Sequence, residues 1–179
     1  LYARYGDLIT ESGIPVSKHD QLKIFRTALE DTLQAYRRLG VRVHIVLQVP
    51  EQHIRVDWFY PRALRGEFGG APTMDREVRA RSISVVDHTE MQREVREVIR
   101  RAADEYGAEV VDLDSYLCDA AICPMGTNTH PYYVDSHHLN VRGAMRVIPA
   151  FDDLFARIKA RDRRTALVYS PRFADASKR

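Results

Sequence analysis

The chain has 179 residues, of which 45% are hydrophobic and 29% charged, and its formal net charge is +2. A chain of this length and composition can form one globular domain with a substantial core. The net charge is too small to indicate a nucleic-acid partner, and no apolar stretch approaches the roughly 20 residues that cross a bilayer.

The first half of the chain predicts a helix, a strand and a long irregular segment. Apolar residues recur at helical spacing from His19 to Leu39, and Gly40 ends this helix. The run from Val41 to Val49 is rich in β-branched residues and stops at Pro50, which predicts a strand buried in a parallel sheet. From Glu51 to Arg81 no regular period is found and prolines and glycines are frequent, so we expect a long loop.

The second half predicts two more helices and one more strand. Asp87 is expected to cap a helix from Thr89 to Tyr106, and Ala108 to Leu113 reads as a second buried strand. Asn140 is a good N-cap for a last helix, whose apolar residues continue at helical spacing to Ile158. This alternation predicts an α/β fold with right-handed crossovers and a parallel sheet. In such folds sites gather beyond the carboxyl ends of the strands.

Several other side chains have a structural interpretation. His44 lies within an apolar strand and is expected to be a packed core histidine, and His88 is expected at a helix start. Trp58, Phe59 and Tyr60 are expected to pack the long loop onto the body, with a sugar-binding groove as the alternative. The many arginines beside acidic residues on the helices indicate solvated helix faces.

Asp135 and His138 form the most informative pattern in the chain. A serine hydroxyl becomes a nucleophile when an imidazole takes its proton, and a carboxylate on the other ring nitrogen orients that imidazole. Two intervening residues allow the backbone to turn so that the Asp135 carboxylate meets the His138 ring just before the last helix. The pair is therefore predicted to be the acid/base half of a catalytic triad. The alternative is a loop-capping aspartate beside a surface histidine.

The two cysteines, Cys118 and Cys123, are separated by four residues in a polar loop. Their closeness suits a small loop-closing disulfide in an oxidising compartment. Two alternatives stay open at this point, two free buried thiols or a zinc site that would also use nearby histidines (His130, His137 and His138). Because the spacing fits neither a two-cysteine knuckle nor a two-histidine helix motif, no metal is predicted.

The string Tyr-Tyr-x-Asp-x-x-His-Leu-Asn-x-x-Gly-Ala at residues 132–144 resembles the last block of SGNH hydrolases. It is similar to the form carried by the periplasmic domains fused to membrane acyltransferase-3 proteins. Residues 112–118 together with Cys123 resemble that family's paired-cysteine loop, and Leu1 to Tyr5 resembles one of its strands. The resemblance implies a three-layer α/β/α sandwich with a flavodoxin-like parallel sheet that lacks its N-terminal strand or strands. Residues 1–160 would be this partial domain, and residues 161–179 a polar tail.

The chain departs from the family pattern at the nucleophile. None of its serines follows Gly-Asp, and the nearest string, Gly6-Asp7-Leu8, has leucine where the hydroxyl is needed. No oxyanion donor is assigned, since only Arg4 or Tyr5 could lie near that place. We therefore expect the Gly-Asp-Ser block and the oxyanion-hole glycine to lie upstream of Leu1, and the fragment alone to be inactive.

The function that the resemblance implies is transfer or removal of O-acyl groups, most simply acetyl. The expected substrate is a cell-envelope polysaccharide or peptidoglycan, with His138 as the base, Asp135 as its partner, and no metal or organic cofactor. The expected partners are an acyl donor, a glycan acceptor and a membrane acyltransferase domain upstream in the same chain, with the whole protein tethered to the inner membrane and facing the periplasm. The alternatives are a non-catalytic carbohydrate-binding or interaction module with the same fold and, less favoured, a metal-dependent hydrolase.

Overall fold

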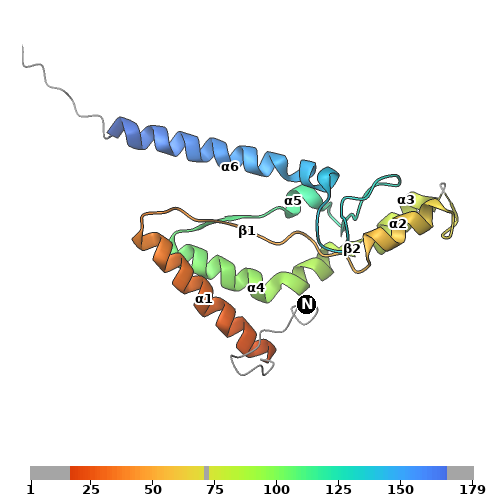
Figure 1. The fold of residues 1–179 in the computed structure, drawn as a ribbon, viewed down its shortest axis with the longest axis horizontal. Helices are drawn as coiled ribbons and strands as arrows, with labels where there is room; N and C mark the ends of the chain where they lie inside the picture. The colour runs from red at the N-terminus through yellow and green to blue at the C-terminus, as the bar shows by residue number, and fades with distance from the viewer. Residues whose placement is uncertain (1–16, 71–72, 169–179) are drawn as a thin grey trace, which may run out of the picture.

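The computed structural model describes residues 17–70 and 73–168 (Figure 1). The elements in chain order are α1 (Lys18–Arg38), β1 (His44–Val46), α2 (Val56–Leu64), α3 (Met74–Arg81), β2 (Ile83–Ser84), α4 (Val85–Tyr106), β3 (Glu109–Val111), α5 (Asp114–Leu117), β4 (Ile122–Cys123) and α6 (Val141–Val168). The strand resemblance at Leu1 to Tyr5, the string at residues 6–8 and the last residues of the predicted tail, 169–179, lie outside the described residues.

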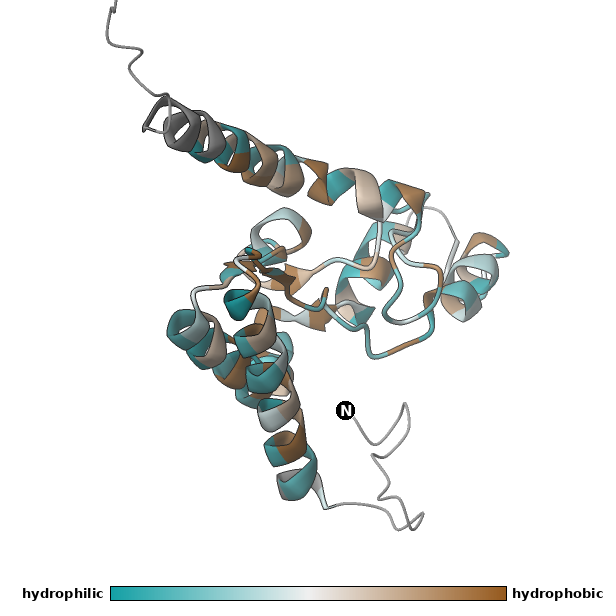
Figure 2. Ribbon diagram, turned by 60° about the vertical axis from the view of Figure 1, so that its left-hand side comes forward, coloured by the Kyte–Doolittle hydropathy of each residue, from teal (hydrophilic) through white to brown (hydrophobic). Residues whose placement is uncertain are grey.

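A parallel pair of strands, β1 and β3, lies between two layers of helices. His44 lies opposite Glu109 in this pair and Val46 opposite Val111. Helix α6 lies on one side of the pair, and α1 and α4 lie on the other, in both views (Figures 1 and 2). This arrangement confirms the predicted α/β class with a parallel sheet. A second pair, β2 and β4, is antiparallel.

The two parallel strands are shorter than the predicted runs, 44–46 instead of 41–49 and 109–111 instead of 108–113. Single hydrogen bonds extend the pairing at both ends, from Glu109 N–H to Val43 C=O and from Leu47 N–H to Val111 C=O, each 3.0 Å. The Nδ1 atom of His44 lies 3.3 Å from Glu109 Oε2 across the pair, and its side chain is largely buried, as expected for a packed histidine.

Helix α4 begins earlier than predicted, and Ser84 rather than Asp87 is its N-cap. The Ser84 hydroxyl oxygen accepts a hydrogen bond from the Asp87 N–H at 2.9 Å, while the hydroxyl donates to the Asp87 carboxylate at 2.7 Å. Serine is among the best residues at this position because its oxygen satisfies a free amide of the first turn. Gly107 ends the helix with a left-handed backbone (φ 75°), as its position predicts.

The segment from Glu51 to Arg81 is not the long loop that the sequence predicts, because it contains α2 and α3. The side chains of Val56, Phe59, Tyr60 and Ala63 are buried, and their spacing is that of one helix face. Pro61 lies within this helix on its exposed side. The apolar period of this helix covers only four residues, and Pro61 with the glycines that follow is typical of a loop, so the sequence pattern hides the helix.

Two clusters form the core. The first joins α2 and α3 to the later loops, and its buried members are Val56, Phe59, Tyr60, Ala63, Met74, Val78, Met125 and Tyr133. The second lies beneath α6, and its buried members are Val111, Leu113, Leu117, Val147, Ala150 and Leu154. The loop of residues 131–140 runs between these clusters, so both of them fix its position.

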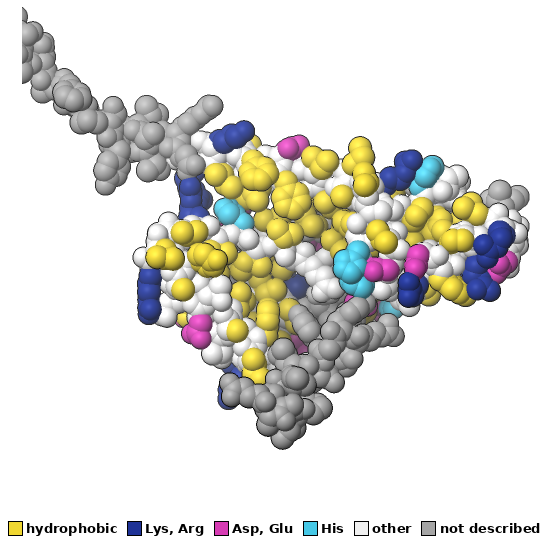
Figure 3. Space-filling model, in the orientation of Figure 1, with side chains coloured by type: hydrophobic (Ala, Val, Ile, Leu, Met, Phe, Trp, Pro, Cys, Tyr) yellow, Lys and Arg dark blue, Asp and Glu magenta, His cyan; other side chains and the backbone are white. Residues whose placement is uncertain are grey.

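Helix α6 runs on to Val168, past the predicted domain end at residue 160. Large hydrophobic side chains remain exposed along it, at Val141, Met145, Ile148 and Phe155, and yellow side chains gather along this helix in Figure 3. Within the described part of the chain, no helix combines the length and the apolar character needed to cross a membrane.

Candidate active site

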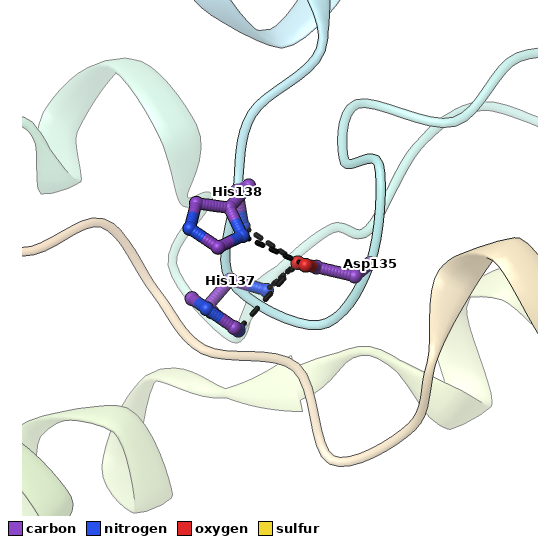
Figure 4. A group of neighbouring side chains, drawn as sticks. All are labelled: Asp135, His137 and His138. Atoms are coloured by element: carbon purple, nitrogen blue, oxygen red, sulfur yellow. Dashed lines mark hydrogen bonds and ion pairs between the residues drawn. The ribbon is translucent and has the colours of Figure 1, made fainter. Parts of the chain in front are cut away.

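The Asp135 carboxylate and the His138 imidazole are in direct contact (Figure 4). The distance from Asp135 Oδ2 to His138 Nδ1 is 2.7 Å. The other carboxylate oxygen, Oδ1, accepts the backbone N–H groups of His137 at 2.8 Å and of His138 at 2.9 Å. The carboxylate therefore orders the backbone on which the histidine is mounted and also binds its ring. The structure brings the two predicted site residues together.

The surroundings of Asp135 favour its ionised form. Its partial burial acts to raise the pKa of the carboxyl, but the His137 N–H, the His138 ring and the His138 N–H outweigh burial and hold the pKa well below its ordinary value. An ionised Asp135 accepts the Nδ1–H of His138, which leaves Nε2 as the acceptor nitrogen. The His138 side chain is 67% exposed while that of Asp135 is 28% exposed. The pair thus presents a free basic nitrogen to the surface.

Backbone hydrogen bonds hold this loop to the rest of the domain. Gln52 N–H donates to Ser136 C=O at 2.7 Å, and Val56 N–H donates to Asp135 C=O at 3.3 Å. Within the loop, Val134 N–H donates to His138 C=O at 2.7 Å. The loop is therefore closed on itself and tied to the start of α2.

Asn140 joins the loop to α6 as the predicted N-cap. Its side-chain oxygen accepts the N–H groups of Arg142 at 2.8 Å and of Gly143 at 3.1 Å, and its amide donates to Pro131 C=O at 2.9 Å. A Cβ atom on Gly143 would lie 2.1 Å from the Tyr132 carbonyl oxygen. Only glycine lets the first turn of α6 approach the loop this closely.

Gln52 is a buried residue behind the loop that the sequence did not single out. It is 1% exposed, and its side chain donates to Cys123 C=O at 3.1 Å and accepts from Ile83 N–H at 3.2 Å. Because its backbone amide also donates to Ser136 C=O, Gln52 connects the loop of Asp135 and His138 with the cysteine loop and β2. These partners are distant in the sequence, so no local pattern predicts them.

A buried ionic cluster lies at the carboxyl end of β3, where the fold class predicts functional groups. His88 Nε2 lies 3.0 Å from Asp114 Oδ1, and Arg96 contacts both oxygens of Asp114. Burial acts to raise the pKa of Asp114, but hydrogen bonds from His88 and Arg96 lower it far below its ordinary value. His88 lies in the first turn of α4, as predicted, and its side chain is a buried member of this cluster. The cluster fixes the loop after β3 to α4.

Cys118 and Cys123 form a disulfide, which confirms the first interpretation of this pair and excludes two free thiols. Since both sulfurs are bonded, they are not zinc ligands. His130, the nearest histidine to that loop, is exposed and its Nδ1 lies 2.7 Å from Thr129 Oγ1. The zinc site that would combine these cysteines with histidines is therefore wrong.

Of the three adjacent aromatic residues on α2, two are buried and one is exposed. Phe59 and Tyr60 are buried in the core, as the packing interpretation predicts. Trp58 is 49% exposed on α2, and the Arg62 guanidinium lies 4.7 Å from the centre of its ring.

A group of side chains able to bind a metal ion includes Asp135 and His138. Asp135, His137 and His138 each offer one atom able to bind a metal ion, and these atoms lie within 4.8 Å of one another. The serine between them, Ser136, has its hydroxyl oxygen 3.2 Å from His137 Nδ1.

Comparison with known proteins identifies the family. The family model described as SGNH domain (fused to AT3 domains) matches residues 1–153. A search of curated proteins and a search of solved structures found no match. The matched range contains the Asp135–His138 loop and the disulfide, and the family supports a domain of the hydrolase or acyltransferase kind. The chain belongs to the family of SGNH domains that are fused to AT3 domains.

Proposed function

We propose that this domain supplies the histidine and aspartate of a serine-dependent O-acyltransferase or esterase that acts on a cell-envelope glycan. The observation that carries the proposal is the 2.7 Å contact between Asp135 Oδ2 and His138 Nδ1, with the other nitrogen of an exposed ring left as the acceptor. That arrangement supports the proposal, because the acid/base half of a serine triad needs an imidazole oriented by a carboxylate in this way. The serine and the oxyanion donors are proposed to come from a segment before Leu1, since no serine of these 179 residues follows Gly-Asp.

The proposed reaction has two halves that share one base. His138 Nε2 takes the proton of the serine hydroxyl while the oxygen attacks the acyl carbonyl, and the imidazolium then returns the proton to the leaving alcohol. In the second half Nε2 takes a proton from a glycan hydroxyl or from water, which attacks the acyl-serine and frees the serine. Asp135 remains ionised throughout and stabilises the imidazolium, in keeping with its lowered pKa.

Two observations support a cell-envelope location for this reaction. The disulfide between Cys118 and Cys123 suits an oxidising compartment such as the periplasm. The family is described as fused to AT3 domains, which supports a membrane acyltransferase domain in the same protein. We therefore place the acyl donor on the membrane side and the glycan acceptor, with acetyl as the simplest acyl group, in the periplasm.

The test uses the complete protein and two substitutions of the pair. His138→Gln and Asp135→Asn should each lower the rate of p-nitrophenyl acetate hydrolysis by roughly 10³–10⁴-fold, as losses of triad members do. His130→Gln is the matched control, because His130 is an exposed histidine five residues before Asp135 whose Nδ1 contacts Thr129 Oγ1. The 179-residue chain alone should show no hydrolysis that depends on His138.

A serine-directed fluorophosphonate probe gives an independent reading. It should label one serine of the complete protein, and labelling should be lost in His138→Gln but kept in His130→Gln. Hydrolysis that survives His138→Gln within about tenfold would overturn the proposal. Binding of an acetylated glycan by the complete protein without turnover or labelling would overturn it too, and would favour the non-catalytic binding module.

A further inference from the structure

The chain carries a second imidazole beside the catalytic pair, which a serine triad does not use. His137 Nδ1 lies 3.5 Å from Asp135 Oδ1, and the centres of the His137 and His138 rings are 3.9 Å apart. Both rings face the same carboxylate (Figure 4). Two imidazoles and one carboxylate therefore converge within a segment of four residues.

This geometry is close to that of a three-ligand zinc site. Zinc binds histidine nitrogen and carboxylate oxygen at about 2.0–2.2 Å in a tetrahedral arrangement, so its ligand atoms are roughly 3.3–3.6 Å apart. Here the Asp135 oxygens lie 2.7 Å from His138 Nδ1 and 3.5 Å from His137 Nδ1. All three ligand atoms lie within 4.8 Å of one another, so zinc binding would require the side chains to close around one ion. The exposure of His138 leaves the remaining coordination position open to water.

The electrostatic surroundings are compatible with a divalent cation. The Asp135 carboxylate is ionised, and its Oδ1 atom is already anchored by two backbone N–H groups, so the ligand set is partly preorganised. The positive charge of the Arg55 guanidinium acts on Asp135 and would repel a cation bound there. Arg55 also donates hydrogen bonds to both oxygens of Asp57, at 3.1 and 2.5 Å, and this carboxylate offsets its charge.

We propose that Asp135, His137 and His138 bind Zn²⁺, and that bound zinc disables His138 as a base. The second half of this proposal rests on the proposed function. As a base, His138 keeps its proton on Nδ1 and uses the lone pair of Nε2. As a zinc ligand through Nδ1, the neutral ring must carry its proton on Nε2, where it can no longer accept one from serine. Catalysis and zinc binding thus require opposite tautomers of the same ring.

Binding is tested by calorimetric titration of ZnCl₂ into the purified chain at pH 7 in a buffer that does not chelate zinc. One equivalent should bind to the wild type. His137→Asn should weaken binding at least about tenfold, since loss of even an outer-shell partner costs about 10–100-fold. His130→Asn makes the same change at an exposed histidine that is not one of the three proposed ligands, and it should bind zinc as the wild type does. Circular dichroism checks that each variant is folded.

The tautomer of His138 provides a second test of the zinc site, which uses the wild-type chain alone. Long-range ¹H–¹⁵N correlation spectra distinguish the two tautomers of each histidine. Addition of ZnCl₂ should move the His138 proton from Nδ1 to Nε2. A His138 ring that keeps its Nδ1–H at saturating zinc would overturn the proposal, as would equal zinc affinity of His137→Asn and His130→Asn.

The test of zinc binding and the test of the proposed acyl chemistry can succeed or fail independently. The complete protein is assayed with ZnCl₂ and with EDTA, and each rate is divided by the same variant's rate in EDTA. Zinc should inhibit the wild type and His130→Asn, and inhibit His137→Asn only at tenfold or more higher concentration. Zinc binding in a protein with no acyl chemistry would leave the metal site standing and refute the proposed function. Acyl chemistry in a protein whose three proposed ligands do not bind zinc would refute the metal site and leave the proposed function standing.

Discussion

Gln52→Leu tests the role of a buried residue that lies behind the loop of Asp135 and His138. Leucine has a similar size but cannot replace the two side-chain hydrogen bonds of Gln52. The Ile83 N–H and the Cys123 C=O, both on fully buried residues, lose these partners. Leaving a buried polar group unsatisfied costs about 1–3 kcal/mol, so with two such groups the free energy of unfolding should fall by about 2–6 kcal/mol. That is a large part of the about 5–15 kcal/mol that stabilises a typical domain.

The assay is urea denaturation of the oxidised chain followed by circular dichroism. Gln48→Leu is the control, because it makes the same change at an exposed position only four residues before Gln52. An exposed substitution of this kind should change the free energy of unfolding by no more than about 0.5 kcal/mol. If the two variants unfolded within about 0.5 kcal/mol of each other, the assigned role of Gln52 would be refuted.

Three other predictions concern the loop. Replacing Cys118 and Cys123 by serine should lower the free energy of unfolding by about 2 kcal/mol, the chain-entropy value for so short a loop; an unchanged urea midpoint against the oxidised wild type would contradict it. Gly143→Ala should destabilise the chain by about 1–3 kcal/mol, although alanine usually favours helices, because its Cβ meets Tyr132 C=O; a raised melting temperature would exclude that clash. For Asp135→Asn, the lowered folded-state pKa means that the carboxylate stabilises the fold above about pH 4 and loses this effect as the pH falls further. The wild type should thus exceed this variant in urea stability at pH 7 by more than at pH 3, and an equal difference at both would refute the linkage.

The sequence predicted the elements that carry a long, regular signal. The helices around residues 19–39 and 89–106, the parallel strands and the last helix have uninterrupted apolar periods, and all are present. The Asp135–His138 contact was predictable because its geometry is local, with only two residues between the partners. The disulfide was predictable for the same reason.

Features that depend on tertiary contacts were missed. Helix α2 has a period of only four buried residues, interrupted by Pro61, and its burial against Met125 and Tyr133 makes it stable. The contact between His88 and Asp114 was not predicted, because the two residues are 26 positions apart along the chain. Gln52 acts on residues 31 and 71 positions away, and no spacing rule covers such separations.

The two long-range tethers of the catalytic loop come from amide groups of the main chain, those of Gln52 and Val56. Every amino acid except proline supplies such a group. The outward side chains of α2, including Asp57 and Trp58, can therefore be exchanged without moving the histidine. The surface next to Asp135 and His138 can thus change in shape and charge while the loop keeps its place, whereas proline at position 52 or 56 would remove one of the two amide donors.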